Sequence, residues 1–437
     1  MWDEPAETMS VDERSALQEQ RLRSLAARLL AAGGLQAERL RAAGIDGAVA
    51  STLSLADLPE LPTTSKQDLW DAYPFGMLAV PQDNVVAVHG SSGTGGRPTL
   101  VGYTRGDLDL WGEMVARSLG CAGASRGTVV HNAYGYGLFT GGVGFHLGGI
   151  RLGATVVPVS SGMTQRQLTL IADLKPQVLT CTPSYAVTLG EAARRDGADV
   201  SSLRAGIFGA EPWSESLRRQ IEQLLPVKAL DVYGLSEVIG PGVATECIEA
   251  QSGLHVNEDH FIVECIDPGT GEPVDDGTPG ELVFTTPTKE ALPLLRYRTG
   301  DLASLHRETC ACGRTLVRMS KVLGRRDDML VVRGVNVYPS EVEAVVLARD
   351  GLEPHYLLVV DGRGAVPELI VCCEAETDRD AHALALDATL RDRLGLRTEV
   401  HVLAPGTLPR QEVGKAVRVV RWVEGAAPLP ELADRRR

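Results

Sequence analysis

A glycine-rich segment, His89-Gly-Ser-Ser-Gly-Thr-Gly-Gly-Arg-Pro-Thr99, gathers hydroxyl groups and one cation in a short stretch of chain. Glycines let backbone N–H groups approach an anion, and serine and threonine hydroxyls add further donors. The segment is not a Walker loop, because proline follows the cation and residues 99–103 are typical of a second strand. The pattern predicts a turn between two strands. By itself, such a turn is as typical of a surface hairpin as of a phosphate-binding loop.

Four further segments place polar side chains at turns. They are Phe208-Gly-Ala-Glu-Pro212, Tyr233-Gly-Leu-Ser-Glu237, Tyr297-Arg-Thr-Gly-Asp301 and Gly414-Lys415. In a parallel sheet, ligands lie beyond the carboxyl ends of the strands. The turns after Val88, Phe208 and Val232 are therefore expected to converge on one site. Each segment alone is also typical of an ordinary turn, in which a Tyr or Asp only stabilises the turn and has no functional role.

Short β-branched runs alternate with amphipathic helical stretches between about residues 85 and 305. The predicted strands are 155–159, 178–181, 205–209 and 228–233, and the predicted helices are 164–174, 185–196 and 214–224. This alternation predicts a mostly parallel α/β core. Nearer the N-terminus, Ser10 and Glu13 form a capping box that begins a helix, and Gly33 ends it.

A second unit follows the α/β core. The polar residues 325–328 precede a fresh apolar run at 329–332. The remainder predicts a helix from residue 340, strands at 356–360 and 368–373, and a helix around 381–393. We expect an α/β protein with a large N-terminal domain at 1–324, a hinge at 325–328 and a small α+β C-terminal domain at 329–437.

The composition narrows the class of protein. The 437 residues carry 57 acidic and 43 basic side chains, a formal net charge of −14. Such a surface repels nucleic acid and anionic lipid, so neither is an expected partner, and a phosphate ligand requires a local basic cluster. Two histidines, Arg151 and many glycines interrupt the apolar stretch 129–160, which argues against a membrane span. The acidic N-terminus is unlike a signal peptide. We expect a cytoplasmic protein whose eight cysteines are thiols or metal ligands.

Together these segments resemble the adenylate-forming superfamily, and specifically the phenylacetate–CoA ligase family. The similarity runs from about residue 58 to residue 420. It includes four more motifs: Tyr73-Pro-Phe-Gly76, Asn132-Ala-Tyr-Gly-Tyr-Gly137, Gly324-Arg-Arg-Asp-Asp328 and Arg333-Gly-Val-Asn-Val-Tyr-Pro339. The resemblance implies an adenylate-forming fold with a mobile C-terminal lid. It implies a ligase that activates an aromatic acid, phenylacetate-like or a substituted benzoate, with ATP and transfers it to coenzyme A, releasing AMP and pyrophosphate. The alternative acceptor is the phosphopantetheine thiol of a carrier protein, and a homodimer is typical of the family.

The resemblance also implies roles for individual residues. The nucleotide would be held by Ser91, Ser92, Gly93, Thr94, Gly96, Glu211, Pro212, Tyr233, Gly234, Ser236, Asp301 and Arg325. Three residues would act on charge during catalysis: Glu237 through an associated Mg²⁺, Arg97 on phosphate, and Lys415 between the attacking carboxylate and the α-phosphate. The sequence departs from the family pattern at Gly95, where threonine is usual, and at Arg97, where lysine is usual. Arginine keeps the charge but not the point-like geometry.

Two successive reactions on one enzyme imply two domain arrangements. Asp327 matches the hinge position of the family. Arg333 and Gly334 would meet the thiol donor after the C-terminal domain rotates.

The candidate acyl pocket combines aromatic rings with glycines. Its predicted lining is Tyr134, Tyr136, Phe139, Ile207, Gly209 and Ile239. Ring faces stack on an aromatic acid and glycines leave room for it, although Phe139 is equally typical of a core residue. The polar neighbours His131 and Asn132 would select a hydroxy- or amino-substituted ring, and the sequence leaves the substituent open.

Three thiols and one imidazole form a candidate metal site. Cys310 and Cys312 follow a turn, and Cys247 and His255 are predicted on two strands that a Gln-Ser-Gly turn separates. The resemblance implies a structural zinc, which some relatives hold with similar residues, and four such ligands fit a closed tetrahedral site. The alternative is a set of buried thiols, which free cysteines usually are.

Overall fold

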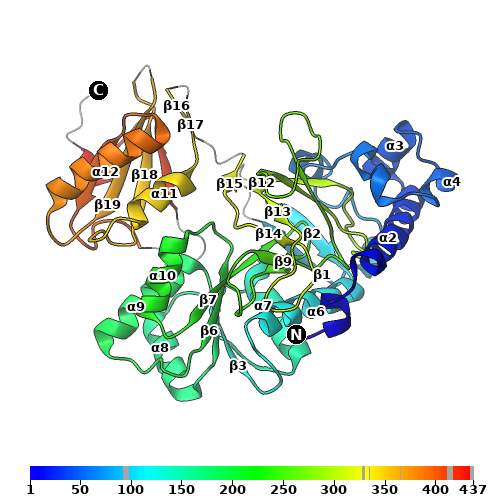
Figure 1. Ribbon diagram of the computed structural model, residues 1–437, viewed down its shortest axis with the longest axis horizontal. Coiled ribbons are helices and arrows are strands. Elements are labelled where there is room, and N and C mark those ends of the chain that lie inside the picture. Colours follow the sequence, from blue (N-terminus) through cyan, green and yellow to red (C-terminus); the bar gives the residue numbers. More distant parts are fainter. Residues whose placement is uncertain (92–97, 327–329, 334, 365, 411–416, 434–437) are drawn as a thin grey trace.

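The computed structural model describes residues 1–91, 98–326, 330–333, 335–364, 366–410 and 417–433 (Figure 1). Within this part of the chain, every helix is too short or too polar to span a lipid bilayer.

A helical N-terminal segment, blue in Figure 1, lies at one end of the molecule. Its elements are α1 (Glu4–Glu7), α2 (Val11–Ala32), α3 (Gly34–Ala42), α4 (Gly47–Ala50), η1 (Leu55–Glu60), α5 (Lys66–Asp71) and η2 (Gln82–Asn84). The predicted capping box is confirmed. Ser10 Oγ accepts from the Glu13 N–H, the Glu13 carboxylate accepts from the Ser10 N–H, and Gly33 ends the helix with φ of 78°.

A nine-stranded sheet with the order β13-β14-β9-β8-β7-β6-β5-β3-β4 forms the centre of the larger unit. The strands from β4 to β7 are parallel, as predicted, and β8, β9, β14 and β13 continue the sheet in antiparallel fashion. The strands are β3 (Val129–Asn132), β4 (Thr155–Pro158), β5 (Val178–Cys181), β6 (Ala205–Gly209), β7 (Lys228–Leu235), β8 (Gly240–Thr245), β9 (Leu254–Val256), β13 (Leu305–His306) and β14 (Arg318–Met319).

Five helices cover the two faces of this sheet. They are α6 (Arg105–Cys121), α7 (Thr140–Leu152), α8 (Thr164–Leu174), α9 (Pro183–Asp196) and α10 (Glu215–Leu224). Apolar residues of α6 and α7 share one core with the sheet, and those of α8, α9 and α10 share another. The carboxyl ends of the parallel strands are therefore held between two rigid layers.

Two smaller sheets complete the larger unit. The hairpin β1 (Ala87–Ser91) and β2 (Thr99–Tyr103) is antiparallel, as predicted for the strands that flank the glycine-rich segment. A four-stranded antiparallel sheet has the order β10-β11-β12-β15. Its strands are β10 (Ile262–Ile266), β11 (Gly280–Thr285), β12 (Tyr297–Ala303) and β15 (Gly324–Arg325).

The C-terminal unit, yellow to red in Figure 1, has its own sheet of order β20-β19-β18-β21 and its own apolar clusters. Its elements are β16 (Leu330–Val332), β17 (Val335–Val337), α11 (Pro339–Leu347), β18 (Tyr356–Asp361), β19 (Glu368–Glu374), α12 (Arg379–Leu394), β20 (Glu399–Leu403), β21 (Val419–Trp422) and η3 (Pro430–Leu432). Strands β16 and β17 pair as a hairpin. The predicted order of strands and helices in this unit is confirmed.

Two local predictions are wrong. The segment Tyr297–Asp301, predicted as a turn, lies within strand β12. Cys247 does not lie on a strand, because β8 ends at Thr245. The Cys247 carbonyl accepts a hydrogen bond from the Gln251 N–H at 3.0 Å, so the backbone turns at this point instead of pairing with a neighbouring strand.

Helices α6 and α7 cross at close range because α7 carries glycines at the contact. A Cβ atom added to Gly148 would lie 2.5 Å from the Val115 side chain, well inside van der Waals contact. We therefore expect Gly148→Ala to lower the free energy of unfolding by about 1–3 kcal/mol, the usual cost of overpacking. Urea denaturation measures this change.

Gly47→Ala is the matched control. Gly47 is the first residue of α4, and an added Cβ meets nothing within 4 Å. Alanine has the higher helix propensity, so this variant should be neutral or slightly stabilising. Equal stability of the two variants would contradict the close helix contact.

Candidate active site and candidate metal centre

Glu237 is a buried carboxylate two residues beyond the end of β7. Its Oε1 accepts a hydrogen bond of 3.2 Å from the Oγ of Ser91, the last residue of β1. The turn after β7 therefore meets the hairpin that carries the glycine-rich segment. The remaining candidates of that segment, Ser92, Gly93, Thr94, Gly96 and Arg97, lie outside the described residues, as do Asp327, Gly334 and Lys415.

Two cations that the sequence analysis missed lie against Glu237. Lys66 Nζ is 3.9 Å from Glu237 Oε1, and Lys289 Nζ donates to the Glu237 carbonyl oxygen at 2.8 Å. Burial lowers the pKa of Lys289 to about 8, although Asp107 and Glu237 favour its charged form. The sequence contained one indication that Lys66 has a role beyond its helix. Lys66 is the first residue of α5, where the positive end of the helix dipole disfavours a cation. Lys289 had no such signal.

Tyr233, Asp301 and Arg325 form a second buried group. Tyr233 Oη donates to Asp301 Oδ2 at 2.7 Å, and Arg325 Nη1 donates to Asp301 Oδ1 at 2.7 Å. The pairing of β12 with β15 places Asp301 directly opposite Arg325. Burial raises the pKa of Tyr233, and the adjacent Asp301 carboxylate raises it further. Arg325 thus pairs with Asp301, another of the residues predicted to hold the nucleotide.

Glu211 follows β6 in a strained turn, where Ala210 adopts φ of 73°. The Glu211 carboxylate accepts from the N–H of Ser184 at 2.8 Å and from its Oγ at 2.5 Å. Ser184 lies in the first turn of α9, where the helix dipole favours a negative charge. Pro212 continues the same loop. Ser184 is a further residue that the sequence analysis missed.

Gly234 and Ser236 shape the turn that leads to Glu237. A Cβ at Gly234 would lie 1.8 Å from the Gly240 carbonyl oxygen, so only glycine fits there. Ser236 Oγ lies 3.3 Å from Thr140 Oγ1. The Ser236 carbonyl accepts from Tyr103 Oη at 3.2 Å. These contacts fix the turn from the α7 side and from β2.

The predicted acyl residues fall into three groups. The Tyr134 ring stacks on Phe145 with centroids 5.3 Å apart. Tyr136 is half-buried and its Oη lies 3.1 Å from His146 Nδ1, whereas Phe139 is 52% exposed at the start of α7. The core residues are Ile207, Ile239 and Gly209, and a Cβ at Gly209 would lie 2.2 Å from the Val232 carbonyl oxygen.

The polar neighbours of the predicted pocket are already bonded within the protein. Asn132 Nδ2 donates to Tyr136 Oη and to the Gly142 carbonyl, both at 2.8 Å. His131 Nε2 donates to Gln167 Oε1 at 2.5 Å on the α8 side of the sheet. Asn132 therefore orients the Tyr136 hydroxyl, and His131 is directed toward α8.

Arg333 lies between β16 and β17 with φ of 53° and forms an ion pair with Glu368 at the start of β19. Both side chains are about two-fifths exposed. The pair lies wholly within the C-terminal unit.

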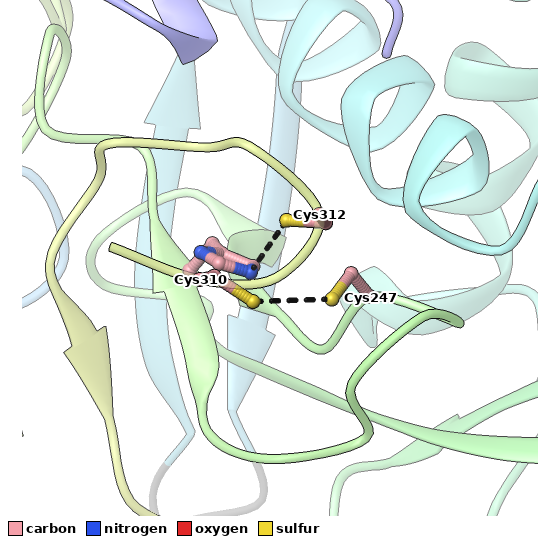
Figure 2. A group of neighbouring side chains, drawn as sticks. Cys247, Cys310 and Cys312 are labelled. Atoms are coloured by element: carbon pink, nitrogen blue, oxygen red, sulfur yellow. Dashed lines mark hydrogen bonds between the residues drawn. The ribbon is translucent and has the colours of Figure 1, made fainter. Parts of the chain in front are cut away.

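Cys247, His255, Cys310 and Cys312 come together as predicted, with their ligand atoms all within 4.8 Å of one another. Figure 2 shows Cys310 and Cys312 on one loop, with Cys247 approaching from another. The first loop joins β13 to β14, and His255 lies on β9. The antiparallel pairing of β14 with β9 brings these segments together.

Two of the separations between these atoms match the edges of a tetrahedral metal site. A zinc ion with Zn–S of about 2.3 Å and Zn–N of about 2.0 Å has S···S edges of about 3.8 Å and S···N edges of about 3.5 Å. The observed Cys247 Sγ···Cys310 Sγ distance is 3.7 Å, and Cys312 Sγ···His255 Nε2 is 3.5 Å. Burial would raise the pKa of the Cys312 thiol, but hydrogen bonds from His255 and Arg314 lower it to about 5.

Known protein families and relatives match most of this chain. The AMP-binding enzyme family matches residues 17–289, and the C-terminal domain of AMP-binding enzymes matches residues 334–421. Phenylacetate-coenzyme A ligase of Thermus thermophilus is 49% identical and covers 96% of this chain and 99% of its own length. The Escherichia coli protein of the same name is 47% identical, with 97% and 98% coverage.

Solved structures of 2-hydroxyisobutyryl-CoA ligase match at two different levels. The postadenylation state with an acyl-AMP gives a TM-score of 0.88 at 27% identity, covering 95% of this chain and 91% of that chain. The thioesterification state with CoA gives 0.72 at 28% identity, with 96% and 92% coverage.

The buried Lys289 should make the free energy of unfolding depend on pH. Its folded pKa of about 8 lies below the ordinary 10.5, so the unfolded chain binds more protons between these values and stability rises with pH there. The wild type should gain about 2 kcal/mol in free energy of unfolding relative to Lys289→Met between pH 7 and pH 9.5. Urea denaturation at both pH values gives the difference. The exposed Lys228→Met is the control and should show no such pH dependence.

Proposed function

The chain belongs to the AMP-binding enzyme family and, within it, to the phenylacetate–CoA ligases, and from this we propose that it joins an aromatic carboxylic acid to coenzyme A with ATP. The observation that carries this proposal is the near-complete coverage of both chains by ligases at 47–49% identity. A carrier-protein acceptor is not favoured, because these relatives are all named for coenzyme A.

The reaction consists of two substitutions. The substrate carboxylate attacks the α-phosphorus of ATP, and the bond to the β-phosphate breaks, giving acyl-AMP and pyrophosphate. The thiol of coenzyme A then loses its proton and attacks the acyl carbon, giving the thioester and AMP. The first step joins two anions, so positioning and cationic stabilisation matter more than proton transfer.

Glu237 would act at the phosphates of the nucleotide and Asp301 at its ribose. The Glu237 carboxylate, beside Ser91, would hold a Mg²⁺ ion, for which it is a suitable hard oxygen ligand. Bound Mg²⁺ would neutralise phosphate charge. Asp301 would accept the ribose hydroxyls, because each of the two oxygens of a carboxylate can accept more than one hydrogen bond.

The other nucleotide contacts come from loops on either side. The glycine-rich segment from Ser91 to Arg97 would hold the phosphates, and Glu211 with Pro212 would lie beside the adenine, as would Tyr233. Lys415 would bridge the carboxylate and the α-phosphate. Lys66 adds a cation on the phosphate side, because it already lies near Glu237.

The acyl group would occupy the space between α7 and the ends of β3 and β6. Tyr136 is the best placed polar residue, because Asn132 and His146 orient its half-buried hydroxyl. Phe139, exposed at the start of α7, would close over the ring of the substrate. This arrangement supports an aryl acid as substrate.

The C-terminal domain would rotate about residues 325–328 between the two steps. The higher TM-score with a postadenylation state than with a thioesterification state supports the view that the present arrangement belongs to the first step. Rotation would bring Arg333 and Gly334 toward coenzyme A.

The four-ligand cluster would hold a structural Zn²⁺. The close agreement of two ligand separations with tetrahedral edges supports this ion. Zinc there would crosslink the β13–β14 loop to β9 and to the turn after β8.

ATP–pyrophosphate exchange over phenylacetates, benzoates, aminobenzoates and heteroaryl acids tests the proposed function. We expect acid-dependent exchange with at least one aryl acid and thioester formation on addition of coenzyme A. Lys415→Ala should lose exchange by about 10²-fold or more and still convert supplied acyl-AMP to thioester, because its charge acts only in the first step. Absence of exchange with every acid, or equal loss of both steps in the variant, would contradict these assignments.

Metal analysis tests the zinc site. Purified wild type should contain about one zinc per chain, and Cys310→Ser with Cys312→Ser should contain almost none and melt at a lower temperature, because two of four ligands are lost. Cys373→Ala is the control, since this buried thiol lies on β19 in the other unit and should leave the zinc content unchanged. Zinc-free wild type would overturn the site.

A further inference from the structure

Glu343 is a carboxylate of the C-terminal domain that is buried against the larger domain. It lies on α11 and is 4% exposed. Its Oε1 accepts from the Ser214 N–H at 2.9 Å, and its Oε2 accepts from Tyr356 Oη at 2.7 Å. Ser214 is the N-cap of α10 in the larger domain, and Tyr356 begins β18 in the smaller one. One carboxylate therefore connects the two domains.

The position of Ser214 strengthens this contact. A helix N-terminus has unsatisfied N–H groups and a partial positive charge, which favour a nearby carboxylate. Figure 1 shows α11 facing α10 across the domain boundary. If the domains separate, Glu343 must exchange the Ser214 N–H for water or for a new partner, and a buried charge that loses a donor is costly.

Arg418 makes a second connection beside the first. Its guanidinium lies over the Tyr356 ring at 4.5 Å, and its Nη2 donates to Ser184 Oγ at 3.2 Å. Ser184 belongs to α9 of the larger domain. In the sequence, Arg418 follows Lys415 by three residues. Arg418, three positions beyond the proposed catalytic lysine in the sequence, thus contacts the larger domain.

Ser184 links this contact to the nucleotide side of the cleft. Its N–H and Oγ both donate to Glu211, which belongs to the turn proposed to flank the adenine. A bound nucleotide that orders the Glu211 turn would therefore also order the acceptor of Arg418.

We propose that Glu343 and Arg418 form an interdomain clamp that selects the domain orientation of acyl-AMP formation, a proposal that rests on the proposed function. Both contacts cross the domain boundary and both must break if the C-terminal domain rotates. Stabilising one of two orientations changes their populations by the difference in interaction free energy. Glu343 and Arg418 are positioning residues, because neither is placed on substrate.

Two half-reaction assays test the clamp. Glu343→Ala and Arg418→Ala should each lower ATP–pyrophosphate exchange by about tenfold, equivalent to about 1.4 kcal/mol. Thioester formation from supplied acyl-AMP should stay within about twofold of wild type or increase, because that step uses the other orientation. Arg418→Lys should recover part of the exchange, since it keeps the charge but not the planar stacking. Arg421→Ala, on the exposed side of β21, is the matched control and should change neither step.

A distance measurement gives a second readout that needs no activity. Spin-labelled unnatural amino acids at the exposed positions Leu174 on α8 and Leu384 on α12 report the orientation by pulsed electron resonance. The wild type should show one dominant distance. Glu343→Ala and Arg418→Ala should add a second population, and Arg421→Ala should not.

The outcomes separate the clamp from the proposed function. Equal loss of both half-reactions, or an unchanged distance distribution in both variants, would overturn the clamp. Lack of exchange by the wild type with every aryl acid would overturn the proposed function, and the distance distributions would still decide the clamp. If Glu343→Ala melts at a markedly lower temperature, the half-exposed Arg418 decides the question alone.

Discussion

Electrostatic repulsion between two anions is the constraint on this site. A carboxylate must approach a phosphate in a protein whose formal net charge is −14. The net negative charge of the chain opposes the binding of both anions. Cations must therefore lie close to the site, where a low dielectric strengthens their attraction for the anions. Lys66 and Lys289 lie on either side of Glu237, one at its carboxylate and one at its carbonyl oxygen.

Dividing the cations between two domains follows from the same constraint. A cation fixed permanently beside the α-phosphate would occupy the space that the second nucleophile needs. A mobile domain could bring the cation to the α-phosphate for the first step and move it away before the thiol attacks. This requires that the domain orientation of the first step be held precisely. Glu343 and Arg418 would supply this hold with directional, part-buried hydrogen bonds across the domain boundary.

Much of the fold could be predicted because its signals are local. Helix α8 and strands β5 and β6 begin and end at the predicted residues, since each has a clear apolar period and clear flanking residues. Cys247 was misplaced because β8 ends at Thr245 and the Cys247 carbonyl accepts from Gln251 in a turn, which strand propensity does not indicate. Lys289 and Ser184 were missed for a related reason: their partners lie 52 and 27 residues away, and neither has a local signal.

Local sequence patterns were enough to predict the parallel core, the two-unit organisation, the cysteine–histidine set and the turn that carries Glu237. These features depend on periodicity, turn chemistry and residue type, which involve only residues that are near one another in the sequence. The packing of distant segments, in contrast, is what pairs Arg325 with Asp301, holds Tyr136 through Asn132, and brings Glu343 to the N-terminus of a helix in the other domain. Hydrogen bonds act over about 3 Å, so partners distant in sequence are known only once the packed layers bring them together.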